Sequence, residues 1–316
     1  MNCRLSTPIG VIVNPEAAGN VNPRERVRRL TALLDGGGWV RETESVDSLN
    51  GVAAEFRARA VGVVAVCGGD GSFSRALSAV VRAYGDAPLP LLLPLRGGTM
   101  NTIARAVGAP RAGPEVVVAK LLERRRAGQP ERIVERDILR VNGDDYGFMV
   151  GAGTIVGFLK AYYAGHRQGP IGAASLLGRL VLSLVGGGKL ARDTFTWLEA
   201  DVSCDGLRVP FRHFSVIYAS SIDQIGLGFR PTYRAGTEPG RFHLIAGPLA
   251  GREFLRCVPA MLRGRPTESS QIFDRSARRV VVEFQHASSY MIDGDVLGTT
   301  TRLCIETGPR VRMIRE

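Results

Sequence analysis

The chain has 316 residues and a formal net charge of +11, and arginine carries almost all of the positive charge because lysine occurs only at 120, 160 and 189. The length suits about two domains with full cores. The five cysteines are odd in number and contain no C-x-x-C pair, which argues against a zinc site or a disulfide framework and favours a reducing cytosol. The longest apolar run, residues 171–185, is too short to span a bilayer and contains Arg179, and the first residues lack the apolar core of a signal peptide. We therefore expect a cytoplasmic protein with no transmembrane segment.

The first 126 residues alternate short apolar runs with amphipathic segments. Strands are predicted at 9–13, 39–43, 61–67 and 89–93, and helices from residue 23, over 50–60, from residue 73 and over 115–126. The fourth strand is expected to end at Pro94. This alternation predicts a parallel sheet with right-handed crossovers. Ligands on such sheets bind beyond the carboxyl ends of the strands, where Asn14, Thr43 and Asp70 are expected to converge.

Two glycine turns follow neighbouring strands and lead into helices. Gly68-Gly69-Asp70-Gly71 follows the strand at 61–67, and the segment 96–101 follows the strand at 89–93. Glycine lets a backbone approach a ligand closely, and the unpaired amides of a first helical turn favour an anion. The first turn alone is explained equally well as a plain connection with Asp70 as a helix cap. Two such turns on neighbouring strands can contact one polyphosphate from two sides, which favours a nucleotide-binding site.

Residues after the break at 128–130 are predicted to form an antiparallel β domain. Its extended runs are short and punctuated by Gly, Asp and Pro, at 132–141, 146–150, 194–204, 208–219, 241–246, 280–284, 289–292 and 301–306. Two segments, 157–185 and 253–263, have helical patterns and form either ordinary core or the walls of an apolar cleft. Asp293-Gly294 is typical of a hairpin turn.

Several common enzyme signatures are missing from the sequence. It contains no G-x-x-x-x-G-K-[ST] loop, no complete dinucleotide fingerprint and no G-x-S-x-G elbow, and its four histidines are scattered singly. The usual signs of metal-hydrolase and triad chemistry are therefore lacking.

Four motifs, taken in order, resemble those of the bacterial diacylglycerol kinase family, whose catalytic domain is shared with sphingosine and ceramide kinases. They are VNPEAAGN at 13–20, GGDGS at 68–72, GTMNTIAR at 98–105 and DGD at 293–295. The resemblance covers nearly the whole chain and implies an α/β plus β fold. Residues 1–128 would form a nucleotide-binding α/β domain with a parallel sheet, and residues 129–304 an antiparallel β-sandwich-like domain for the lipid substrate. The last strands, at 305–316, would return to the first domain.

The resemblance also implies ATP and Mg²⁺ as cofactors. Asp70 would help to fix the magnesium carried by ATP, directly or through water. Asp293 would be the base for the acceptor hydroxyl, with Asp295 at the position of the family's glutamate, so the predicted catalytic residues are Asp70, Asp293 and Asp295. The predicted ATP-binding residues are Asn14, Thr43, Gly68, Gly69, Asp70, Gly71, Ser72, Gly98, Thr99 and Asn101.

The sequence departs from the family pattern at four places. Ser72 replaces the usual threonine but keeps a hydroxyl, and Thr102 replaces an aspartate. The second turn is two residues longer than usual, and its Arg96 could reach phosphates. Pro239 stands where relatives often carry an aspartate ligand of a structural magnesium, so we expect this metal site to be lost and assign no metal ligands.

These observations predict an ATP-dependent kinase of a diacylglycerol-like or sphingoid alcohol, associated peripherally with a membrane. The alternatives are a soluble NAD kinase-like enzyme and a lipid-binding protein of the same fold that has lost catalysis. The arginine excess fits an ordinary solvated surface or an anionic membrane. Nucleic acid is not expected as a partner, because no basic stripe is interleaved with aromatic residues. A homodimer is left open.

Overall fold

The computed structural model describes residues 7–17, 19, 22–165 and 169–315, so Cys3 and positions 18 and 20 of the first motif lie outside the described residues. The chain divides into two compact units. Residues 1–136 and 310–316 form the first, called the N-terminal unit, and residues 137–309 form the second, called the β unit. The predicted fold class is confirmed, since parallel strands build the first unit and antiparallel strands the second.

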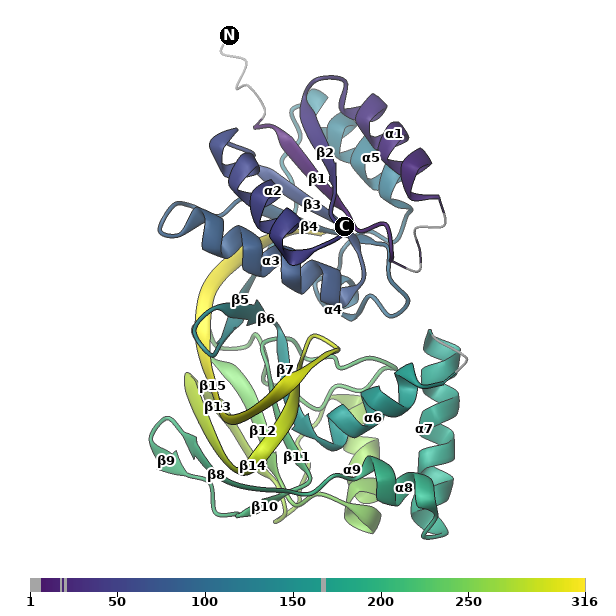
Figure 1. The fold of residues 1–316 in the computed structure, drawn as a ribbon, viewed down its shortest axis with the longest axis vertical. Helices are drawn as coiled ribbons and strands as arrows, with labels where there is room; N and C mark the ends of the chain where they lie inside the picture. Colours follow the sequence, from purple (N-terminus) through teal and green to yellow (C-terminus); the bar gives the residue numbers. More distant parts are fainter. Residues whose placement is uncertain (1–6, 18, 20–21, 166–168, 316) are drawn as a thin grey trace. The chain divides into compact units, whose positions relative to one another are not determined.

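The N-terminal unit is a parallel sheet covered by helices on both faces (Figure 1). Its strands lie in the order β2-β1-β3-β4, followed by the end of β15. Buried apolar residues fill β1 and β3 completely, as expected for strands covered on both sides. The elements are β1 (Ile9–Val13), α1 (Pro23–Leu34), β2 (Gly38–Glu42), α2 (Val46–Ala58), β3 (Val63–Gly68), α3 (Asp70–Tyr84), β4 (Leu91–Arg96), α4 (Thr102–Ala106) and α5 (Pro114–Arg126).

Strand β4 runs through Pro94, so the strand end predicted at that residue is wrong. The Leu91 amide donates to the carbonyl of Gly62, just before β3, at 2.9 Å, and the Gly97 amide donates to the Gly68 carbonyl at the end of β3 at 3.1 Å, so odd-numbered amides of this strand face β3. Position 94 therefore faces the opposite side, where β15 pairs with β4 through Met313 and Leu92. A residue without an N–H is tolerated there because no ladder bond to β3 depends on it.

The β unit is built on an antiparallel sheet in the order β13-β12-β11-β7-β14-β15. Strand β14 organises it, because its first half pairs with β8 and its last residues pair with β7, while β15 lies along its other edge. The strands are β5 (Ile133–Val141), β6 (Asp145–Gly147), β7 (Met149–Gly153), β8 (Leu198–Cys204), β9 (Leu207–Arg208), β10 (His213–Phe214), β11 (Val216–Ser220), β12 (Phe242–Gly247), β13 (Phe273–Ala277), β14 (Arg279–Ile292) and β15 (Asp295–Ile314).

Four helices of the β unit pack as a group beside these strands (Figure 1). They are α6 (Thr154–Tyr163), α7 (Pro170–Val185), α8 (Lys189–Thr194) and α9 (Gly251–Arg263). A small apolar core formed by Leu180, Ala191, Phe195 and Phe254 joins α7, α8 and α9. Within the described residues, no helix is both long enough and apolar enough to cross a bilayer.

The predicted elements of the second half differ from the observed ones in extent. The runs at 280–284 and 289–292 belong to one strand, β14, which continues past a register shift between Glu283 and Ser288. The run at 194–204 begins with the end of α8, and the run at 208–219 is divided among three short strands. Strand β13 and helix α8 were not predicted, because their sequences, FDRSA and KLARDT, lack a clear apolar period.

Candidate functional site

The first glycine turn joins β3 to α3 in the N-terminal unit. Strand β3 ends at Gly68, and Gly69 is the N-cap of α3. As a glycine, Gly69 makes no side-chain capping hydrogen bond, so the first-turn amides of this helix lack the partner that a serine or aspartate cap supplies. Amides of this kind, at the positive end of a 15-residue helix, are suited to bind an anion.

The second glycine turn follows β4 and presses against the first. A Cβ added to Gly98 would lie 2.3 Å from the Cα of Gly69, and a Cβ added to Gly97 would lie 2.8 Å from the amide nitrogen of Gly68. The Gly97 amide donates to the Gly68 carbonyl at 3.1 Å. Only glycine permits this contact between two backbones. The two turns are therefore one packed structure.

The side chain of Asn101 shapes the second turn. Its Oδ1 accepts from the Gly98 amide at 3.1 Å, and its Nδ2 donates to the Gly98 carbonyl at 2.6 Å. The residue itself has a left-handed backbone, with φ of 50°, which asparagine tolerates better than most residues. Both polar atoms of the Asn101 amide are thus used to hold the turn.

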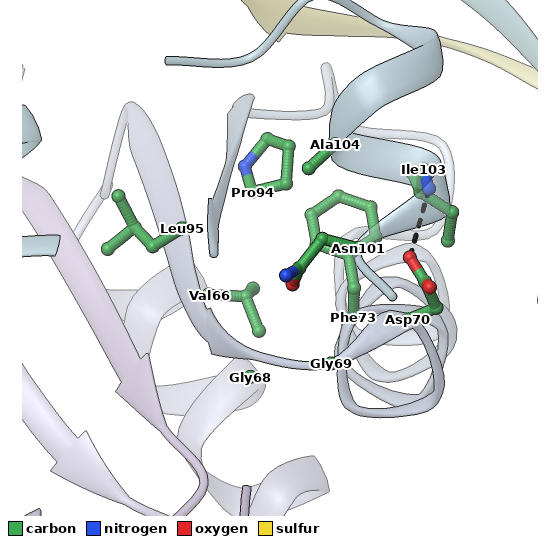
Figure 2. A pocket seen from close by; sticks show the side chains of 10 residues that line it. All are labelled: Val66, Gly68, Gly69, Asp70, Phe73, Pro94, Leu95, Asn101, Ile103 and Ala104. Atoms are coloured by element: carbon green, nitrogen blue, oxygen red, sulfur yellow. Dashed lines mark hydrogen bonds between the residues drawn. The ribbon is translucent and has the colours of Figure 1, made fainter. Parts of the chain in front are cut away.

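Asp70 joins the two turns through its carboxylate. The amides of Thr102 and Ile103, the first residues of α4, donate to its two oxygens at 2.8 and 2.9 Å. Figure 2 shows the bond from Ile103. Desolvation raises the pKa of Asp70, and the two amides and the positive charge of Arg105 offset part of that rise. The Asp70 side chain, at the start of α3, therefore caps the N-terminus of α4. Because the two segments are far apart in sequence, no local sequence pattern predicts this contact.

The remaining predicted nucleotide-binding residues have different environments. Asn14 donates from Nδ2 to Ser72 Oγ at 2.7 Å, which ties the end of β1 to the first turn. The Thr43 amide donates to the Val13 carbonyl at 3.1 Å, and its side chain is buried. Thr99 is exposed, and Arg96 donates from a terminal guanidinium nitrogen to the Ala109 carbonyl at 3.1 Å.

A small pocket opens between the two turns (Figure 2). Polar groups of the turns and an apolar floor from β3, β4 and α4 share its lining, which consists of Val66, Gly68, Gly69, Asp70, Phe73, Pro94, Leu95, Asn101, Ile103 and Ala104. The uncapped amides and the side-chain-free glycines fit the phosphates of a nucleotide. Both carboxylate oxygens of Asp70 already accept amide N–H groups, so a magnesium ion here would be held chiefly by those phosphates.

The terminal D-G-D motif lies in the β unit, where the predicted hairpin turn is confirmed. Ile292 pairs with Asp295, and Asp293 and Gly294 between them have φ of 49° and 94°, as a two-residue hairpin loop requires. The hydroxyl of Tyr163, at the end of α6, donates to the Gly294 carbonyl at 3.0 Å. This bond fastens the tip of the turn to the helical group.

The Asp293 carboxylate is buried and fixed by backbone amides. The Phe148 amide lies 3.0 Å from each of its oxygens, and the Met149 amide donates to Oδ1 at 2.7 Å. A Cβ added to Gly147 would lie 2.6 Å from Oδ2, so a glycine is needed there. Sequence reasoning missed this partner segment, whose only signal is a glycine before an apolar run. Asp295, by contrast, is partly exposed.

The segment around Pro239 holds no cluster of acidic side chains. The Gly240 amide donates to Asp137 Oδ2 at 2.8 Å, so the nearby carboxylate accepts a backbone hydrogen bond from this turn. Across the described residues, no group of three His, Cys, Asp or Glu side chains is placed to hold a metal ion.

Comparison with known proteins bears on the sequence motifs and on the fold. Residues 8–130 match the family model described as the diacylglycerol kinase catalytic domain, which confirms the resemblance. A candidate diacylglycerol kinase from Bacillus anthracis strain Sterne has a similar structure, with a TM-score of 0.69 and 17% identity over 98% of this chain and 97% of that one. A diacylglycerol kinase structure from the same strain gives 0.62 and 16%, with the same coverage. A search of curated proteins finds no match.

Proposed function

We propose that this chain, whose residues 8–130 match the diacylglycerol kinase catalytic domain, is an ATP-dependent kinase that phosphorylates the hydroxyl of a diacylglycerol-like or sphingoid lipid. The observation that carries the proposal is the pair of packed glycine turns joined by Asp70. A turn that served only to connect a strand to a helix would need no second glycine turn pressed against it.

The proposed role of the N-terminal unit is to bind ATP. The uncapped amides of α3 and the backbone of the second turn would surround the phosphates, and Asn14 and Ser72 would contribute polar side chains. Magnesium bound with ATP would supply charge neutralisation on the phosphates. We propose Asp70 as an organiser of the phosphate site, because its carboxylate holds α4 and the second turn in place.

The proposed role of Asp293 is to orient the acceptor hydroxyl and to take its proton. The amides of Phe148 and Met149 hold the carboxylate in place, and a carboxylate oxygen can accept a hydrogen bond from an alcohol. In the reaction, the alcohol oxygen forms a bond to the γ-phosphorus, the bond from that phosphorus to the ADP oxygen breaks, and the alcohol proton passes to Asp293. The fixed amides keep the carboxylate in one orientation throughout.

A direct assay tests this function. Purified protein is incubated with labelled ATP, magnesium and vesicles of a total lipid extract, and in parallel with NAD, and labelled products are identified by mass spectrometry. We expect a labelled lipid phosphate, and we expect Asp293→Asn to yield almost none. Labelled NAD phosphate without labelled lipid would favour an NAD kinase-like enzyme. Lipid binding without any transfer from ATP would indicate a lipid-binding protein.

We further propose that the enzyme acts in the cytoplasm at the surface of a membrane. A lipid alcohol with two acyl chains, or one long chain, resides in a bilayer, so the protein must reach its substrate there. Fractionation of cells expressing the protein tests this: we expect release from membranes by salt, whereas release only by detergent would contradict peripheral association.

A further inference from the structure

Helix α7 presents an apolar face that no other part of the described chain covers. Its large side chains are among the most exposed apolar residues of the protein, with Ile171 79% exposed, Leu182 74% and Val185 76%. Ala174 and Gly178 lie between them and are also exposed. At 100° per residue these positions fall within one arc of the helix, so they form a continuous stripe rather than scattered contacts. We call this stripe the α7 face.

The opposite side of α7 is anchored, so the α7 face has a fixed orientation. Leu180 is buried with Ala191 and Phe195 of the α8 region and with Phe254 of α9. In Figure 1, α7 lies at the outer edge of the helical group, away from the strands of the β unit. The exposed apolar side chains therefore belong to a helix that is packed on its other side.

The helical group that carries the α7 face has an excess of positive charge. Helices α6 to α9 together carry seven basic and two acidic side chains. One of the two acidic residues, Glu253, is paired with Arg256 at 3.4 Å. Arg179 lies beside the stripe at its midpoint and is exposed. An apolar stripe flanked by arginine and lysine is the composition of a helix that lies in the interface of an anionic bilayer.

A second copy of the chain fits this face poorly. An isologous contact through the stripe, which is centred near residue 178, would bring the two copies of Arg179 together. Like charges at that distance are unfavourable, and the other basic side chains of the helical group would add to the repulsion. Anionic lipid headgroups would instead be attracted by the net positive charge of the helical group, and the apolar stem of Arg179 could lie along the stripe.

We propose that the α7 face is the membrane-docking surface of this protein and that its partner is an anionic lipid bilayer. The helix lies parallel to the membrane plane, with Ile171, Leu182 and Val185 inserted at the boundary between headgroups and acyl chains. Arg179, beside the stripe, contacts the lipid phosphates, and the remaining net positive charge of the helical group adds a longer-range attraction. This inference rests on the proposed function for its purpose, since docking brings a lipid kinase to its substrate, but docking itself requires neither ATP nor turnover.

Vesicle flotation of the full-length protein without ATP tests the docking surface. The probe is a vesicle with about 30% phosphatidylglycerol in phosphatidylcholine, compared with phosphatidylcholine alone and with about 0.5 M salt. We expect binding to the anionic vesicle that salt weakens. The variant Ile171→Ser/Leu182→Ser/Val185→Ser should bind at least about tenfold more weakly. Leu207→Ser, which removes a side chain 58% exposed on β9, is the matched control and should bind within about twofold of the wild type.

Two further measurements make the outcome decisive. Phosphorylation of the lipid substrate found in the kinase assay, presented in detergent micelles, should be unchanged in the triple variant, because only docking to a bilayer is impaired. Loss of this activity in micelles would assign these residues to the substrate cleft and overturn the proposal. Light scattering should give the same mass for wild type and variant, and a dimer that dissociates in the variant would assign the face to self-association. If the triple variant unfolds, Leu182→Ser alone replaces it. Undiminished vesicle binding by a folded variant also overturns the proposal.

Discussion

At the scale of single residues, Asp293 has a structural role in addition to the proposed role of general base. Its carboxylate satisfies two buried backbone amides, and the residue is 2% exposed. Asp293→Asn places an NH₂ group against the Phe148 amide, so we expect the free energy of unfolding to fall by about 1–3 kcal/mol. We also expect turnover to fall by about a hundredfold or more, because the proposed general base is lost, while ATP affinity changes little. Urea unfolding and steady-state kinetics measure the two effects.

Asp295→Asn is the matched comparison for this prediction. The side chain is partly exposed and lies two residues away on the same hairpin, so we expect a change in stability within about 0.5 kcal/mol. If Asp295→Asn abolishes turnover and Asp293→Asn preserves it, the base is Asp295 and the role proposed for Asp293 is wrong.

Asp70 makes stability depend on pH in a direction that can be tested. Desolvation raises the pKa of Asp70 above its value of about 3.9 in the unfolded chain, so between these two pKa values the folded state binds more protons. In that window the free energy of unfolding falls as pH rises. Asp70→Asn has no such proton, so the stability of the wild type minus that of the variant should decrease as pH rises above the pKa of the unfolded chain. Urea titrations of both proteins over this range measure the difference.

The opposite slope would have a definite meaning. If the wild type gains stability relative to Asp70→Asn as pH rises, the folded-state pKa lies below the unfolded value. The amides of Thr102 and Ile103 would then outweigh desolvation.

At the scale of elements, the contact between the two glycine turns determines the geometry of the candidate site. Gly98→Ala places a Cβ 2.3 Å from the Cα of Gly69, and backbone atoms cannot move aside as a flexible side chain can. We expect a loss of at least about 2 kcal/mol in the free energy of unfolding, together with weaker ATP binding. Thermal unfolding and nucleotide titration calorimetry measure these effects.

Gly51→Ala is the control for this substitution. Gly51 lies within α2, and a Cβ there meets no atom within 4 Å. Alanine in a helix interior should raise stability by about 0.5–1 kcal/mol and leave ATP binding unchanged. Equal effects of the two substitutions would show that the turns are not in contact as described.

The sequence predicts those parts of the fold that depend on local pattern. The apolar runs of β1 and β3, the glycine stop after β3 and the Asp293-Gly294 hairpin each follow from neighbouring residues. The continuity of β14 could not be predicted in this way. Polar residues after Phe284 interrupt the apolar alternation, while the strand itself continues with a register shift. The contacts of Asp70 with α4 and of Asp293 with 148–149 span 32 to 145 residues and leave no local signal.

At the scale of the whole molecule, the last strand completes the N-terminal unit. Residues 310–316 belong to that unit although they follow the entire β unit in sequence. Val311 and Met313 are fully buried, Ile314 joins the core of the parallel sheet, and Met313 pairs with Leu92. A fragment that stops before residue 310 would therefore expose the edge of β4. We therefore expect the folding of the first unit to depend on residues 310–316.

Met313→Ala tests this dependence, with tryptophan fluorescence reporting the unfolding of each unit separately. The two tryptophans of the chain are Trp39 on β2 and Trp197 in the β unit, so Trp197→Phe leaves a signal from the N-terminal unit alone, and Trp39→Phe leaves one from the β unit. Removing the buried Met313 side chain should lower stability by about 2–5 kcal/mol in the Trp39 signal. Arg312→Ala, at the exposed neighbouring position, should change it by less than about 0.5 kcal/mol. A loss confined to the Trp197 signal would contradict the assignment of this strand to the N-terminal unit.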